Sequence, residues 1–193
     1  MRKEDLLRIF TNLPQFETER LVFRRMLLCD AEDMYAYACL PEVTEYLTWN
    51  AHPDLTYTKR YLSYIATRYR VGEFYDFALI CKQDGHMIGT CGFTRFDLQN
   101  DAAEIGYVLN PTYWRQGYGT EAVSFILNYG FRALGLNRIE ARFMLGNFAS
   151  RKVMEKCGMQ FEGISRGLMK IKGRYEDIGI CSITATEYNT LHN

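Results

Sequence analysis

The sequence lacks an excess of charge of either sign. Its 193 residues include 23 lysines and arginines and 23 aspartates and glutamates, so the formal net charge is zero. Such a chain has no overall positive field to attract nucleic acid, although a local basic groove remains open. We therefore expect no direct nucleic-acid partner.

Long apolar runs are also missing. The N-terminal segment MRKEDLLRIF mixes charges into a short apolar set, which is typical of neither a signal peptide nor a membrane span. We expect a cytoplasmic protein with no membrane association. With 48% apolar residues, the chain is not disordered, and its length suits a single domain over residues 1–193 with a full core.

The chain has few histidines and no cysteine motif. The three histidines lie in a loop, a turn and a terminal tail, at His52, His86 and His192. The six cysteines form no Cys-x-x-Cys pair, and several lie in apolar strand-like runs: Cys29, Cys39, Cys81, Cys91, Cys157 and Cys181. We expect reduced, mostly buried thiols, no metal site and no Ser-His-Asp or Cys-His mechanism.

Residues 1–16 form a leader segment ahead of the regular pattern. Within it, residues 3–10 predict a short helix with Leu6, Leu7 and Phe10 on one side. Two interpretations stay open: a leader packed on the domain, or a docking element of a homodimer. The last hairpin is a second candidate surface for such a dimer.

The remaining pattern predicts an α+β fold. Strand-like runs occur at residues 18–26, 74–81, 87–96, 103–109, 138–144, 163–171 and 175–184. Helical patterns occur at residues 31–40, 58–69, from about 120 onward and at 150–157, with Asp30 as an expected N-cap and Pro41 as an expected stop. An irregular aromatic loop spans residues 46–53. This order predicts a mixed, mostly antiparallel central sheet.

The stretch that begins at Ala102 combines a strand, a glycine-bearing loop and a helix start. The strand turns at Asn110-Pro111, and the loop Arg115-Gln-Gly-Tyr-Gly-Thr120 leads into a helical pattern. The first N–H groups of a helix have no internal partner, so this arrangement favours an anion. The loop lacks the lysine of a nucleotide-triphosphate loop, and position 122 is alanine where a dinucleotide loop has its third glycine.

This loop resembles the pyrophosphate loop of the GNAT superfamily of acetyl-CoA-dependent N-acetyltransferases, with Gly117 and Gly119 on its two small positions. Trp114 at the first position departs from the general pattern but is similar to the Rim-type branch, the ribosomal-protein alanine N-acetyltransferases. Residues 17–24, ETERLVFR, and residues 147–158, NFASRKVMEKCG, resemble two further blocks of that branch. The resemblance covers roughly residues 17–188 and implies a three-layer α/β/α fold.

The resemblance implies transfer of an acetyl group from acetyl-CoA, without a metal, to a primary amine that attacks directly in a ternary complex. The loop residues expected to hold the co-substrate are Trp114, Arg115, Gln116, Gly117, Tyr118, Gly119 and Thr120. The main chain of Tyr107, Val108 and Leu109 is implied to pair with the pantetheine arm, and an N–H there is the natural oxyanion donor.

Glu104 is the candidate general base. It shares one strand face with Gly106 and Val108, and its neighbours Ala103 and Ile105 are apolar. Partial desolvation would suit it to take a proton, directly or through water. Two simpler roles stay open: holding the positive amine, or pairing with an arginine across the sheet.

Asn147 and Ser150 are the candidates near the leaving thiolate. Many GNAT enzymes carry a tyrosine seven residues after the motif asparagine, and here that position is Met154. Ser150 resembles the serine that Rim-type enzymes place near the sulfur, so we expect it to donate or relay a proton while Asn147 orients the pantetheine. The alternative is helix capping, which both residue types favour.

The acceptor is the least defined part of the prediction. The resemblance places it between the early helices and the final hairpin, with Tyr46, Trp49, Tyr175 and Asp177 as candidate contacts. A protein N-terminus, such as that of a ribosomal protein, is the leading acceptor. A small amine such as a polyamine, an amino acid or an antibiotic is an alternative, and a non-catalytic acyl-CoA-binding regulator is another.

Overall fold

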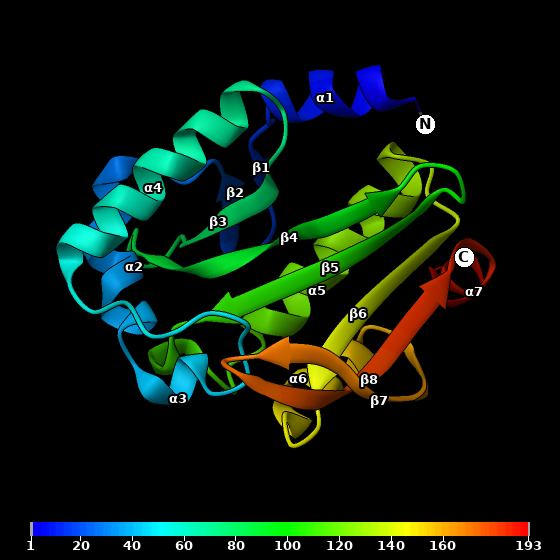
Figure 1. The fold of residues 1–193 in the computed structure, drawn as a ribbon. Helices are drawn as coiled ribbons and strands as arrows, with labels where there is room; N and C mark the ends of the chain where they lie inside the picture. The colour runs from blue at the N-terminus through cyan, green and yellow to red at the C-terminus, as the bar shows by residue number, and fades with distance from the viewer. Residues whose placement is uncertain (1, 193) are drawn as a thin grey trace.

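A sheet of eight strands runs through the centre of the computed structural model, which describes residues 2–192 (Figure 1). Its strands are β1 (Phe16–Glu17), β2 (Leu21–Arg24), β3 (Tyr75–Cys81), β4 (Met87–Asp97), β5 (Ala102–Leu109), β6 (Arg138–Met144), β7 (Gln160–Ile171) and β8 (Arg174–Thr184). Their order across the sheet is β1-β2-β3-β4-β5-β6-β8-β7. All neighbouring strands are antiparallel except β5 and β6, which are parallel. The expected mixed, mostly antiparallel sheet is confirmed.

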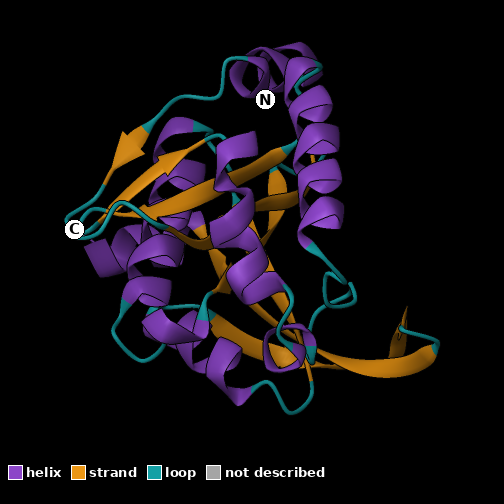
Figure 2. Cartoon of the chain, turned by 90° about the vertical axis from the view of Figure 1, so that its left-hand side faces the viewer, coloured by secondary structure: helices purple, strands orange, loops and turns teal. Residues whose placement is uncertain are grey.

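Helices cover both faces of this sheet (Figure 2). They are α1 (Lys3–Thr11), α2 (Ala31–Ala38), α3 (Pro41–Thr44), α4 (Leu55–Arg70), α5 (Tyr118–Asn128), α6 (Phe148–Lys156) and α7 (Ala185–His192), with short helical turns at Leu28–Asp30, Pro111–Tyr113 and Tyr129–Ala133. Helices α2 and α4 lie over one face of the first strands, whereas α5 lies on the other face, where Phe125 packs 4.3 Å from Phe23 between ring centroids. The arrangement is the expected three-layer α/β/α fold.

The core forms because each central strand sends alternate apolar side chains to the α5 face. Phe77 on β3, Cys91 on β4 and Ile105 on β5 are all buried there. The leader helix joins the same core, since Leu6 and Phe10 are buried and the Phe10 ring lies 4.8 Å from that of Tyr75. Burial of these two side chains explains why the short helix α1 is ordered.

Strands β5 and β6 pair over only part of their length. Their parallel register runs from Ala102 opposite Arg138 to Ile105 opposite Ala141, and no pairing between them continues beyond it in the described chain. From Gly106 to Leu109, β5 pairs with β4 alone, while the end of β6 pairs with β8 alone. The two strands therefore diverge, and a gap opens between their carboxyl ends.

Several element ends differ from the sequence prediction. Asp30 does not cap α2 with its side chain; it accepts a hydrogen bond from Leu27 N at 2.7 Å and pairs with Arg24 instead. Pro41 occupies the first turn of a separate helix, α3, where a missing N–H costs nothing. Helix α4 begins at Leu55, earlier than expected, because Asp54 caps it by accepting from Tyr57 N. Strand β1 and helix α7 were not predicted.

Within residues 2–192, no helix is both long enough and apolar enough to span a membrane. The same part of the chain contains no cluster of three or more metal-ligating side chains. Cys81, Cys91, Cys157 and Cys181 are buried, whereas Cys29 is exposed, and all are free thiols.

The ion pair between Arg24 and Asp30 yields a stability prediction. Both guanidinium nitrogens lie 2.7 Å from the carboxylate oxygens, and Asp30 is only 5% exposed. Asp30→Asn leaves a half-buried guanidinium without its counter-charge, so we expect a loss of about 3 kcal/mol, measured as a lower urea midpoint at unchanged slope.

Glu155→Gln is the matched control, because it breaks the exposed pair that Glu155 forms with Arg151 at 2.7 Å on one helix face. Such a pair contributes about 0.5 kcal/mol or less. Equal shifts of the urea midpoint in the two variants would contradict the structural importance of Asp30.

Candidate active site

The glycine loop between β5 and α5 presents a row of unused donors. Gly117 precedes α5 in a left-handed conformation, with φ of 88°, and Arg115 also has a positive φ of 60°. In the described chain, none of the backbone N–H groups of residues 115–120 donates a hydrogen bond to a protein acceptor. Together with the dipole of α5, these donors form the kind of site that binds phosphate. The loop therefore fits a ligand with a pyrophosphate group.

The two loop glycines are needed for different reasons. At Gly117 the positive φ itself disfavours any residue with a Cβ. At Gly119 an added Cβ would lie 3.3 Å from Leu109 Cδ1 and 3.6 Å from Val153 Cγ2, so a small residue lets α5 approach both β5 and α6. Glycine is therefore favoured at position 117 by the backbone conformation and at position 119 by packing.

Arg20, immediately before β2, supports the loop from the side. Its Nη1 donates to Gln116 O at 2.8 Å, its Nε donates to Glu121 Oε2 at 2.7 Å, and its guanidinium lies 4.4 Å from the centre of the Tyr118 ring. These contacts orient the loop and place a positive charge beside it. Sequence reasoning missed this role, although Arg20 belongs to the block ETERLVFR that it singled out.

Trp114 folds back onto the end of β5. Its indole Nε1 donates to Leu109 O at 2.8 Å, while the side chain remains 43% exposed. The tryptophan thus fixes the point where the unpaired edge of β5 meets the loop. From Gly106 to Leu109, this edge faces the gap between β5 and β6 with no strand partner on that side.

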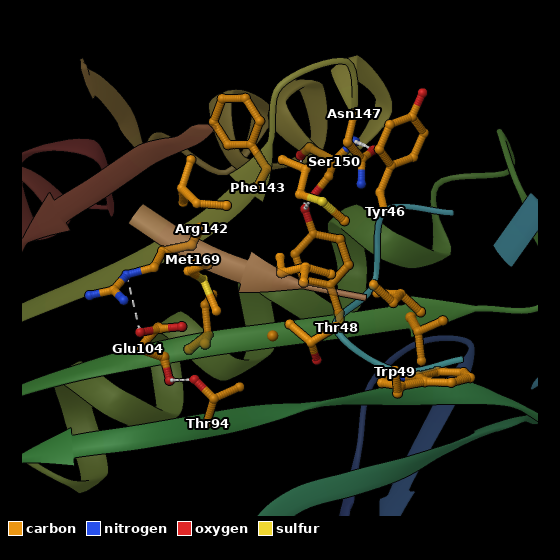
Figure 3. Close-up of a pocket in the computed structure, with 18 of the residues that line it drawn as sticks. Tyr46, Thr48, Trp49, Thr94, Glu104, Arg142, Phe143, Asn147, Ser150 and Met169 are labelled. Carbon is orange, nitrogen blue, oxygen red and sulfur yellow. Dashed lines mark hydrogen bonds and ion pairs between the residues drawn. The ribbon is translucent and has the colours of Figure 1, made fainter. Parts of the chain in front are cut away.

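A cavity of about 260 Å³ adjoins the gap (Figure 3). Its floor is formed by side chains of β4, β5 and β6, including Thr90, Thr94, Glu104, Val108 and Arg142. Its other walls come from the loop after α3 and from the β7–β8 hairpin: Tyr46, Thr48, Trp49, Met169 and Ile171. The hairpin and the loop meet where Lys172 Nζ donates to Thr44 O. The cavity is therefore a partly open hollow between segments that are distant in sequence.

Glu104 lies on the cavity floor and is already paired with cations. Its carboxylate lies 3.3 Å from Arg142 Nε and 3.7 Å from Arg95 Nη2, and its side chain is 18% exposed (Figure 3). Glu140, next to it in the β5–β6 register, shares both arginines. Of the roles considered from the sequence, the structure shows pairing with an arginine, which makes Glu104 a fixed negative charge beside the cavity.

Ser150 and Tyr107 form a hydrogen-bonded pair across the gap. The Tyr107 hydroxyl lies 2.8 Å from Ser150 Oγ and also donates to Ser150 O at 2.8 Å. Burial raises the pKa of the Tyr107 phenol, so the group stays protonated at neutral pH. Asn147 caps α6 by accepting a hydrogen bond from Ser150 N at 3.1 Å. Sequence reasoning used Tyr107 only for its main chain and missed its phenol.

The structure separates the predicted acceptor contacts into two groups. Tyr46 and Trp49 line the cavity. Tyr175 is 73% exposed and packs against Lys170, with Nζ 5.7 Å from the ring centre. Asp177 accepts a hydrogen bond from Gly167 N at 2.7 Å within the hairpin. Neither of the last two residues lines the cavity.

Asp76 lines the cavity and was not predicted. It lies on β3, accepts a hydrogen bond from Phe77 N at 3.0 Å and is hydrogen-bonded to the side chain of Thr90. Burial raises the pKa of Asp76 to about 7, and the two hydrogen bonds only partly offset this. The available sequence signal was one acidic residue inside the otherwise apolar strand run 74–81.

Comparison with known proteins agrees with this geometry. Residues 20–160 match the model of the acetyltransferase (GNAT) domain family. The uncharacterized N-acetyltransferase p20 of Bacillus licheniformis is 38% identical over 171 residues, which are 89% of this chain and 96% of that protein.

Solved structures share the fold. An acetyltransferase of the GNAT family from Bacillus anthracis superposes with a TM-score of 0.79 at 26% identity, over 90% of this chain and 99% of that one. The ribosomal-protein-S5-alanine acetyltransferase from Vibrio fischeri superposes with a TM-score of 0.75 at 23% identity, over 91% and 98% of the respective chains.

The loop geometry predicts the effect of a charge at Gly117. Gly117→Glu places a carboxylate among donors suited to phosphate, so we expect calorimetry to detect no binding of acetyl-CoA. Gly135→Glu is the control for backbone strain, because Gly135 has a similar φ of 67°, has no neighbour within 4 Å of an added Cβ and lies beyond the far end of α5. Equal affinity in the two variants would show that the phosphates bind elsewhere.

Proposed function

The chain belongs to the GNAT family of acetyltransferases and is an N-acetyltransferase that uses acetyl-CoA as its co-substrate, and we propose that its acceptor is the α-amino group at the N-terminus of a protein. The observation that carries this proposal is the gap between β5 and β6, with donors for a phosphate-bearing ligand at one side and a partly open cavity at the other.

We assign the co-substrate to the loop and to the unpaired edge of β5. The free N–H groups of residues 115–120 suit the pyrophosphate, and Arg115 adds a positive charge next to it. The edge from Tyr107 to Leu109 offers main-chain groups to the pantetheine arm, and Asn147 lies at the start of the helix across the gap. The fit is supported by glycines at the two loop positions where a Cβ is disfavoured or tightly packed.

In this proposal each step of the transfer has a residue close to the gap. When bound, acetyl-CoA supplies a thioester that an amine can attack. Glu104 attracts the positively charged acceptor, and a main-chain N–H at the end of β5 stabilises the negative charge that develops on the carbonyl oxygen. The Tyr107–Ser150 pair supplies the proton that the leaving thiolate needs, because the phenol remains protonated at neutral pH.

The size of the cavity supports a narrow acceptor. At about 260 Å³ it lies just below the range of roughly 300–1,000 Å³ that is usual for ligand pockets. Such a cavity suits the end of a polypeptide or a small amine, not a folded surface. The ribosomal-protein-S5-alanine acetyltransferase shares the fold, and we extend its acceptor class to this chain by that analogy.

A panel of amines tests the acceptor. The protein is incubated with acetyl-CoA and either peptides that begin with alanine or serine or small amines such as polyamines and amino acids, and free thiol is measured. We expect thiol release with the peptides at a kcat/KM at least about tenfold above that of any small amine, a difference of about 1.4 kcal/mol in barrier. Thiol release with small amines alone would show that the acceptor is a small amine and not a protein N-terminus. Binding of acetyl-CoA without any thiol release would indicate an acyl-CoA-binding regulator.

Glu104→Gln tests whether this carboxylate holds the acceptor. We expect the acceptor KM to rise about tenfold, with little change in kcat or in the KM for acetyl-CoA, because a binding interaction is lost. A loss of kcat that is greatest at low pH would instead identify Glu104 as the base. Glu140→Gln is the matched control, since Glu140 contacts the same arginines, with Arg142 Nη2 at 2.9 Å, but does not line the cavity. We expect its acceptor KM to be unchanged.

A further inference from the structure

A strip without side chains crosses the cavity floor. In the sheet register Asp76 on β3 lies opposite Gly92 on β4, and Gly92 lies opposite Gly106 on β5. Residues paired in this way point to the same face of a sheet, and the two glycines have no side chain there. The strip therefore leads from the Asp76 carboxyl to the point where β5 leaves β6.

One carboxyl oxygen of Asp76 lies beside the start of this strip. Its Oδ1 lies 2.9 Å from the position that a Cβ on Gly92 would occupy, so the side chain lies over that glycine. Gly106 is one strand further, at the usual spacing of about 4.8 Å between neighbouring strands. An amine above Gly106 is therefore within reach of Asp76 through one bridging water molecule.

Asp76 has no cationic partner in the described chain. Its hydrogen bonds come from Phe77 N and the Thr90 side chain, and no ion pair to it is found among residues 2–192. Glu104, on the same sheet face, lies within ion-pair distance of Arg142 and Arg95. Of these two cavity-lining carboxyl groups, only Asp76 has no cationic side chain within the described residues to balance its negative charge.

We propose that Asp76 is the group that takes the proton from the acceptor's ammonium and thereby prepares the amine for attack. This inference rests on the proposed acetyl transfer and deepens it, because it assigns the base to a residue on β3. Glu104 attracts the charged acceptor, and Asp76 neutralises it.

The groups packed around Asp76 are neutral at neutral pH. Helix α2 contributes Tyr37, helix α4 contributes Tyr61 and Tyr69, and β4 carries Cys91 on its opposite face. Burial raises the pKa of each of these hydroxyl and thiol groups, so none carries a charge near pH 7. The charged pair of Glu104 and Arg142 lies elsewhere on the floor. With a pKa of about 7, a large fraction of Asp76 is a carboxylate at neutral pH, and this carboxylate is basic enough to accept a proton.

The protons of the ammonium ion are all accounted for in the acetyl transfer. The acceptor arrives as an ammonium with three protons on nitrogen, and Asp76 takes one of them. As the C–N bond forms and the C–S bond breaks, the Tyr107–Ser150 pair passes a second proton from the nitrogen side to sulfur. The amide keeps the third proton, and Asp76 releases its proton to water. One ammonium ion, one thioester and no further reactant yield one amide, one thiol and one released proton.

Asp76→Asn tests the proposal in the full chain. In the wild-type protein we expect kcat/KM for the acceptor to rise with pH through a midpoint near 7, as Asp76 ionises. In the variant we expect kcat to fall about 100-fold and the rising limb of this pH profile to disappear. The affinity for acetyl-CoA should be unchanged. Circular dichroism and calorimetric binding of acetyl-CoA verify that the variant is folded.

Thr90→Val provides a readout that a structural role would not move. The Thr90 hydrogen bond favours the charged form of Asp76, so its loss raises the pKa of the carboxyl and moves the limb to higher pH, by an expected 0.5–1 unit. An unmoved limb would overturn the assignment.

A direct titration complements the kinetics. The carboxyl carbon of Asp76, assigned in the NMR spectrum by its loss in Asp76→Asn or by selective labelling, should titrate near pH 7 in the wild-type protein. A midpoint below pH 5 would overturn the proposal whatever the activity. Wild-type turnover with an unchanged pH profile in Asp76→Asn would also overturn it and leave acetyl transfer intact. Absence of thiol release by the wild type with every amine would overturn the proposed acceptors and the role of Asp76 together.

Discussion

The divergence of β5 from β6 is the constraint on which the site depends. Two parallel strands that stay paired satisfy each other's main-chain groups, and these two pair only as far as Ile105 and Ala141. Beyond that point β5 keeps its bonds to β4 and leaves its other edge free. The same divergence makes room for the Tyr107 side chain to reach Ser150 on α6. One local break in a regular ladder thus provides a free strand edge, a tyrosine–serine hydrogen bond across the gap and the wall of a cavity.

The local parts of this arrangement were predictable from the sequence. The strand from Ala102, the loop with Gly117 and Gly119, and the following helix are each encoded within a few neighbouring residues, and the structure contains all three. The bounds of β6 were also predicted correctly, because its alternation is regular and a polar turn precedes it. Asp30 was assigned the wrong partner, because a cap is a local signal whereas its ion pair with Arg24 depends on where β2 ends.

Features that depend on register could not be predicted. Asp76, Gly92 and Gly106 are far apart in sequence, and only the pairing of β3, β4 and β5 aligns them on one face. Arg20 contacts Gln116 across a still larger separation of 96 positions. Sequence periodicity states which face a residue takes on its own strand but not which residue lies opposite. A one-residue slip of β3 against β4 would turn Asp76 away from the cavity, and no local pattern reports that slip.

The side-chain-free strip also bears on how such an enzyme can diversify. The loop proposed to hold the co-substrate follows β5, whereas Asp76 and Gly92 of the strip lie on β3 and β4, so substitutions in one need not disturb the other. Gly106 has one close neighbour on that face, Thr94 Cγ2, at 2.9 Å from an added Cβ. A paired change at these two positions would alter the depth of the cavity while the phosphate site stays the same. After gene duplication, a few substitutions would therefore change the acceptor of one copy while acetyl-CoA stays its acetyl donor.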